Sequence, residues 1–172
     1  MLGLIRAIAL AGLLALGSAH TALAQAPDTG MDKQSDGRFT GIAVVTDNVD
    51  WYEMFQRPEP PQFDGKGHYG PGDRGSLAII FSNPEPRNGV VRVLCDIVAR
   101  DPAETRRVAS EAVCYEGPYL GPNILHPALL DLRFEMGADE PAGQAGFSVT
   151  LNDAYSGRAV TLDVSFTQGP GR

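Results

Sequence analysis

Cysteine and histidine are scarce in this sequence, which has two cysteines and three histidines among its 172 residues. One histidine lies in the first 24 residues, which leaves Cys95, Cys114, His68 and His126 as soft metal ligands. None of them has the short ligand spacing of a structural zinc site, and no histidine lies two or three residues from a cysteine as a blue-copper site requires. The stretches TDNVD and LNDAYSG leave a calcium site open, although neither has a recognised ligand spacing. We expect His126, between Leu125 and Pro127, at a strand edge and His68 in a loop, so the sequence predicts no metal site.

Motifs for nucleophilic or cofactor chemistry are also missing. The chain has no Gly-x-Ser-x-Gly elbow and no Cys-x-x-Cys pair. Residues 65–70 (GKGHYG) have the spacing of a dinucleotide-binding fingerprint, but that motif needs a strand before it and a helix that begins within it. Pro61 precedes this stretch and PGDRG follows it, so we expect a flexible surface loop. No catalytic or cofactor-binding residue is predicted, and the chain is not expected to be an enzyme.

Long apolar runs are confined to the start of the chain. Residues 1–6 form a short positively charged start, residues 7–16 are an apolar run, and residues 22–24 (ALA) suit signal peptidase. We therefore predict a signal peptide at residues 1–24, cleavage before Gln25, and export to the periplasm or the extracellular space. No cysteine lies near the cleavage site, so a lipid anchor is not expected. No later stretch approaches the ~18 apolar residues of a membrane span.

Basic residues are too few to balance the acidic ones. Lysine and arginine number 14 against 21 aspartates and glutamates, so the net charge is −7, and it becomes −8 when Arg6 is removed with the signal peptide. A chain this acidic repels phosphate backbones and anionic lipid surfaces. Nucleic acid and membrane surfaces are therefore not expected partners.

The 148 residues that remain of 172 after removal of the first 24 have the size of one domain. Residues 25–38 lack an apolar period and are predicted to be a flexible segment, residues 39–168 a single domain, and residues 169–172 a tail. Within the domain, short apolar runs alternate with turn residues about every ten positions, which is typical of antiparallel β structure. We predict about seven strands, at residues 39–46, 76–82, 90–99, 106–115, 129–136, 146–152 and 159–167.

The last three predicted strands have the cleanest alternation. In residues 129–136 the even-numbered positions are apolar and most of the odd ones charged. In residues 147–167, apolar residues alternate with Ser, Thr, Asn and Asp on both sides of the turn-rich connector NDAYSGR. This pattern predicts a hairpin with one dry face.

Residues 141–167 (PAGQAGFSVTLNDAYSGRAVTLDVSFT) resemble the final hairpin of immunoglobulin-like and fibronectin-III-like domains of exported bacterial proteins. The resemblance implies an all-β, antiparallel β-sandwich of immunoglobulin-like type, and it transfers no active site, because that architecture has many unrelated functions. The sequence departs from the family in one respect. Trp51, the single tryptophan, precedes both cysteines instead of lying between them.

The two cysteines lie on the apolar faces of neighbouring segments. In residues 90–99 (VVRVLCDIVA) the odd-numbered positions, Cys95 among them, are apolar, and Cys114 shares the apolar even-numbered face of the next segment. A hairpin folded about Glu104 and Thr105 would place Cys95 opposite Cys114, within the Cα separation of a disulfide. Because exported proteins meet an oxidising compartment, we predict a structural disulfide between them.

A local signal in the same region points to another structure. Residues 101–104 (DPAE) form a capping box with proline at the first helical position, so a helix over residues 102–113 is the alternative to the second strand. The end of such a helix could also bring Cys114 to Cys95.

The segment DNVDWYEMFQRPEPPQF is the most unusual stretch of the chain. Trp51, Met54 and Phe55 have the i, i+3, i+4 spacing of an apolar helix face, between a candidate cap at Asn48 and a stop at Pro58. The spacing predicts one short helix from about Asn48 to Arg57.

Two interpretations of this helix remain open, of which we favour the first. Its apolar face plugs one open end of the sandwich, or it belongs to an exposed aromatic surface that receives a partner. The candidate residues of that surface are Trp51, Tyr52, Phe55, Phe63 and Tyr69, and Tyr115, Tyr119 and the prolines of YEGPYLGPNILHP would extend it.

These features together predict an exported, non-catalytic binding or accessory module of the bacterial cell envelope, with a protein or another envelope component as its partner. Two alternatives remain: a structural envelope protein without a discrete ligand, and a carbohydrate-acting enzyme domain that uses surface carboxylates and an aromatic cleft. The sequence makes no prediction of the oligomeric state.

Overall fold

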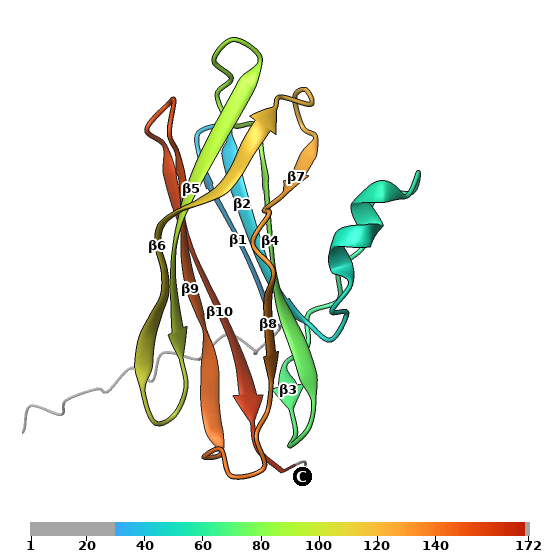
Figure 1. Ribbon diagram of the computed structural model, residues 1–172, viewed down its shortest axis with the longest axis vertical. Coiled ribbons are helices and arrows are strands. Elements are labelled where there is room, and N and C mark those ends of the chain that lie inside the picture. The colour runs from blue at the N-terminus through green and yellow to red at the C-terminus, as the bar shows by residue number, and fades with distance from the viewer. Residues whose placement is uncertain (1–29, 171–172) are drawn as a thin grey trace, which may run out of the picture.

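A computed structural model describes residues 30–170, which fold into ten strands in two sheets and one short helix (Figure 1). The predicted signal peptide at residues 1–24 lies outside the described residues. Within residues 30–170, no helix combines the length and apolarity that a membrane crossing requires.

The two sheets pack face to face, so the fold is an all-β sandwich, as the strand pattern predicted. Every strand pair is antiparallel except β3 with β10. Sheet A consists of β1 (Met31–Asp36), β2 (Phe39–Thr46) and β4 (Arg74–Ser82), with β7 (Leu125–Pro127) and β8 (Leu132–Glu135) both paired to β4. Sheet B has the order β3 (His68–Tyr69), β10 (Ala159–Gln168), β9 (Gly143–Asp153), β5 (Val90–Arg100) and β6 (Thr105–Pro118).

The main core lies between the sheets and is built as the alternation predicted. On the β9–β10 hairpin, Val149 pairs with Leu162 and Leu151 with Val160, and all four side chains are buried. Strand β4 is apolar at consecutive positions because both of its faces are covered. Its odd-numbered residues from Leu77 to Phe81 face sheet B, while Ala78 and Ile80 face the helix η1 (Trp51–Gln56), which Figure 1 shows beside sheet A.

Three strands were not predicted: β1, β3 and β7. The prediction of a flexible segment at residues 25–38 is wrong for β1, which pairs with β2. Its sequence, MDKQSD, lacks apolar alternation because it is a polar edge strand. The carboxylates of Asp32 and Asp36 accept hydrogen bonds from the backbone N–H groups of Asp163 (2.8 Å) and Ala159 (3.3 Å), so they cover the free edge of β10.

The flexible loop predicted at residues 65–70 is also partly ordered as a strand. The two residues of β3 pair in parallel with the end of β10, and His68 Nδ1 lies 3.0 Å from Thr167 Oγ1. The strand predicted at residues 129–136 is shorter than expected, since β8 begins at Leu132. Its apolar face is confirmed, because Leu130, Leu132, Phe134 and Met136 pack against the main core.

The predicted disulfide is present: Cys95 on β5 is bonded to Cys114 on β6, both are buried, and their Cα atoms are 5.7 Å apart. The predicted register of this hairpin is wrong. Cys95 pairs with Ala112, and Cys114 is the extra residue of a β-bulge between the pairs Val93–Tyr115 and Leu94–Val113.

The hairpin turns at residues 101–104, and the alternative of a helix over residues 102–113 is wrong. Asp101 acts as a cap, since its Oδ1 accepts from the N–H groups of Ala103 and Glu104 (both 2.8 Å). However, the Asp101 N–H donates to the Glu104 carbonyl (2.9 Å), which closes the chain into a tight turn and sends it back along β5. The capping box therefore stabilises a hairpin tip.

Candidate binding site

Trp51 is the centre of the aromatic cluster and is itself buried. Its side chain, 2% exposed, packs with Val44, Ala78 and Ile80 on the outer face of sheet A. Its indole N–H donates to Ser76 Oγ over 3.0 Å. The core interpretation is therefore correct for Trp51, but the helix covers the outside of one sheet and not an open end of the sandwich.

Three of the other predicted aromatic residues surround Trp51. The ring centroids of Tyr52, Phe55 and Phe63 lie 5.9, 6.2 and 6.3 Å from that of Trp51. Tyr52 is 40% exposed, and Phe55 and Phe63 are half-buried. These three side chains therefore combine contact with the small core under η1 and access to solvent.

Tyr69 does not belong to this cluster. Strand β3 points its side chain into the main core, where the ring lies 5.2 Å from Phe134 and 5.0 Å from Phe166. The side chain is fully buried. Tyr69 is therefore a core residue and is not available to a partner.

A groove of about 650 Å³ separates η1 and the proline-rich segment after it from residues 115–127. We call it the outer groove. Its most exposed large apolar side chains are Leu120, at 54%, and Ile124, at 45%. Most of its other lining residues carry rings or apolar chains: Tyr52, Met54, Phe55, Pro58, Pro60, Pro61, Tyr115, Leu125 and Pro127. Four polar or charged residues complete the lining: Gln56, Arg57, Glu59 and Asn123.

Half of the exposed large apolar side chains of residues 30–170 gather in the outer groove and the hollow beside it. Eight such side chains exceed a third exposure, and Tyr52, Leu120 and Ile124 line the outer groove. Leu129, the most exposed at 55%, lines a neighbouring hollow of about 360 Å³ that shares Tyr52. Leu120, Ile124 and Leu129 were not among the predicted surface residues. For Leu120 and Ile124, large apolar residues outside any strand period in a Gly- and Pro-rich segment were a readable signal, whereas Leu129 was assigned to the predicted strand at residues 129–136.

Tyr115 and Tyr119, expected to extend the surface, differ in position. Tyr115 is buried at the edge of the groove, and its hydroxyl donates to the Pro118 carbonyl (3.2 Å). Burial, with a smaller contribution from nearby Tyr52, raises the pKa of Tyr115. The ring of Tyr119 instead stacks over His126.

His126 was predicted at a strand edge and is in fact fully buried. Its imidazole stacks on Phe81, with centroids 5.2 Å apart, and contacts the rings of Tyr115 (5.3 Å) and Tyr119 (6.4 Å). Neither ring nitrogen has a hydrogen-bond partner in the part of the chain that the structure describes. Burial therefore lowers the pKa of His126, because the charged imidazolium would lose its hydration.

This burial predicts an acid-dependent loss of stability. Below pH ~6.5 the unfolded chain binds a proton at His126 that the folded chain excludes, so the free energy of unfolding should fall by about 1.4 kcal/mol per pH unit until the lowered folded-state pKa is reached. His126→Phe should abolish this slope in urea unfolding between pH 7 and pH 5. The exposed His68, replaced by Gln, is the control that should retain it. An unchanged slope in His126→Phe would contradict the assignment.

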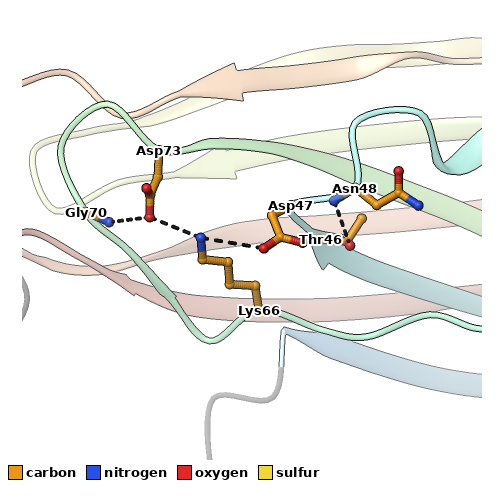
Figure 2. A network of polar contacts seen from close by, with 6 residues as sticks. All are labelled: Thr46, Asp47, Asn48, Lys66, Gly70 and Asp73. Atoms are coloured by element: carbon orange, nitrogen blue, oxygen red, sulfur yellow. Dashed lines mark hydrogen bonds and ion pairs between the residues drawn. The ribbon is translucent and has the colours of Figure 1, made fainter.

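A polar network joins the end of β2 to the loop before β4 (Figure 2). Lys66 Nζ lies 3.1 Å from Asp73, 3.8 Å from Asp47 and 4.7 Å from the centre of the Tyr69 ring. The Gly70 N–H also donates to Asp73 over 3.0 Å, and this bond, followed by Lys66, lowers the pKa of Asp73. Burial, followed by the charges of Asp47 and Asp73, raises the pKa of the Tyr69 hydroxyl. Through its two ion pairs, Lys66 holds the segment that leads from the outer groove to β4 against the end of β2.

Asp153, in the stretch LNDAYSG, is a fully buried carboxylate with protein donors. It accepts hydrogen bonds from the N–H groups of Glu85 (2.8 Å) and Tyr155 (3.2 Å) and from the Ser156 hydroxyl. These bonds hold the β9–β10 turn against the loop after β4. No group of three or more His, Cys, Asp or Glu side chains within residues 30–170 is arranged to hold a metal ion.

Comparison with known proteins gives no family. No protein-family model matches the chain, and no curated protein matches it. A family 123 glycoside hydrolase from Clostridium perfringens is similar in structure, with a TM-score of 0.40 and 9% sequence identity. The similarity covers 74% of this chain and 27% of that one, so the chain spans about a quarter of its length.

Proposed function

We propose that this protein is an exported, non-catalytic binding module of the cell envelope, and that its outer groove receives a protein partner. One observation carries the proposal: half of the exposed large apolar side chains of residues 30–170 gather in the groove and the hollow beside it. Contiguous exposed apolar surface is costly in water, and on a folded domain it marks an interaction site.

The groove is suited to apolar or aromatic anchor residues of a partner. Pro58, Pro60 and Pro61 fix the backbone of one wall, and the ring of Tyr52 is held by its contact with Trp51. A rigid wall loses little conformational entropy when a partner binds, which favours affinity. Because the exported chain carries a net charge of −8 (−7 for the full chain, less Arg6), two copies repel each other, so the proposed partner is a different protein of neutral or basic charge.

The positions of the reactive side chains support a non-catalytic role. Cys95 and Cys114 are joined to each other, Asp153 is buried with three protein donors, and Lys66 is engaged by two carboxylates. The buried disulfide supports export, because such bonds persist in oxidising compartments. Kinship with immunoglobulin-like domains is part of the proposal, supported by the β9–β10 hairpin and its buried alternating face.

Site-specific photo-crosslinking in the exporting cell tests the proposal. A benzophenone amino acid at Ile124 should form one discrete adduct with another protein. The same probe at Thr161, exposed on the outer face of sheet B, is the control and should not form it. The proposal is contradicted if both positions give the same adducts or none, or if the Ile124 adduct is a dimer of this chain.

A further inference from the structure

The two sheets separate at one edge of the sandwich. Toward the C-terminal end of β6 the edges touch, since the Leu129 N–H donates to the Cys114 carbonyl over 2.7 Å. From there toward the β5–β6 turn, at the lower end of Figure 1, β6 stays paired with β5 and β8 stays paired with β4. A cavity of about 470 Å³ lies in the gap, and we call it the edge cavity.

The floor of the edge cavity is aromatic. Phe134 stacks on Phe166 with ring centroids 5.6 Å apart, and Phe147 lies 5.9 Å from Phe134. Phe166 is buried, whereas Phe134 and Phe147 are half-buried and present part of each ring to the cavity. Phe134 lies over Gly75, where a Cβ atom would collide with its ring, so the sequence of β4 leaves room for this floor.

The side walls are apolar as well. Val108 stands at one side of the cavity and is 40% exposed, and Leu132 and Met136 form the other side. The one buried amide in the lining, that of Gln168, already donates to the Pro141 carbonyl over 2.9 Å. The interior therefore offers apolar contact to a ligand.

Charged groups stand at the rim, and several are already neutralised. Arg100 pairs with Asp163 at 3.1 Å, and Glu135 pairs with Arg74 at 2.9 Å. Glu104, Arg106 and Glu140 also line the cavity, and none of them makes an ion pair with the residues that the structure describes. A polar head group at the rim would meet both signs of charge and would stay in water.

We infer that the edge cavity binds the acyl chain of a single-chain amphiphile, with the chain between the sheets and the polar head at the rim. The volume lies within the range of about 300–1,000 Å³ that is usual for small-molecule sites. The lining comes from both sheets, with Val108 of β6 on one side and Leu132 of β8 on the other, so an apolar chain that enters at this edge would lie between the sheets against core side chains. Transfer of that chain from water onto the phenyl rings supplies the binding free energy. This site is separate from the outer groove and does not depend on the proposed protein partner.

Fluorescence titration with cis-parinaric acid, followed by displacement with dodecanoate and dodecanol, tests the inference. The purified exported chain should bind the probe saturably with one site per molecule, and both dodecyl compounds should displace it, because the chain and not the head is recognised. Val108→Trp places an indole in the mouth of the cavity at an already exposed position, so it should weaken binding about tenfold or more without unfolding the protein.

Val113→Trp is the matched control, since Val113 lies on the same strand with 42% exposure and does not line the cavity. It should bind the probe as the wild type does, and circular dichroism should show the same fold for both variants. The absence of saturable binding would overturn the inference. Equal binding by the two tryptophan variants would also overturn it, because the probe would then sit elsewhere.

Discussion

Trp51→Ala is expected to lower the free energy of unfolding by about 3–5 kcal/mol, the usual cost of removing a buried tryptophan. The indole fills the space between η1 and β4, and its N–H bond to Ser76 would be lost at the same time. Phe55 and Phe63 would lose their central ring contact, so η1 should detach from sheet A. Urea unfolding at pH 7 measures the loss.

Tyr52→Ala is the control for this prediction. Tyr52 neighbours Trp51 in the chain but is 40% exposed, so its removal should cost less than about 1 kcal/mol. A Trp51→Ala protein of wild-type stability would show that Trp51 is a surface residue and that the small core under η1 does not exist.

Removal of the disulfide is expected to have the next largest effect. The bond closes a loop between residues 19 apart in sequence, which the chain-entropy model converts to about 3 kcal/mol of stability. The double variant Cys95→Ala/Cys114→Ala should therefore unfold at clearly lower urea concentration, and the oxidised wild type treated with a reductant should approach it. Two thiols that react with an alkylating agent in the unreduced protein would contradict the prediction.

The parts of the fold that were predictable are those where one face of a strand is dry. Strand β2 begins and ends at the predicted residues, and the β9–β10 hairpin has the predicted inward face, because Val, Leu and Phe alternate with polar residues there. Strand β1 was not predictable in this way. It contributes carboxylates and not apolar side chains, and its place is set by pairing with β2 and by bonds to β10.

The β5–β6 hairpin shows where period-2 reasoning succeeds only in part. Both cysteines point inward as predicted, yet three register shifts, one of them at Cys114, change which residues face each other. The bulge near Glu111, which has a φ of 48°, is held by the Asp96 carboxylate, which accepts from the Glu111 N–H at 3.1 Å. Asp96 also accepts from the Ser110 hydroxyl at 3.2 Å, and the apolar pattern does not record such side-chain bonds between strands.

The sequence predicted the aromatic residues of one wall of the binding surface but not the residues of the other wall. Tyr52, Phe55 and Phe63 were named, and they do gather around Trp51. The second wall of the outer groove comes from residues 115–127, which the pairing of β7 with β4 and the hydrogen bonds between Asn123 and Asn83 hold beside sheet A. His126 was misplaced for a related reason, since its neighbour Pro127 suggested an edge whereas Phe81 opposite it turns the imidazole into the core.

The affinity of the partner recovered from the Ile124 adduct tests the outer groove most directly, when it is measured by calorimetry against two double variants. Leu120→Glu/Ile124→Glu places charges in the groove and should weaken binding at least about tenfold, with an unchanged Tm because both side chains are exposed. The control Val108→Glu/Val113→Glu alters two exposed valines of β6 that do not line the outer groove, and it should bind as the wild type does. Equal affinity for both double variants would contradict the account.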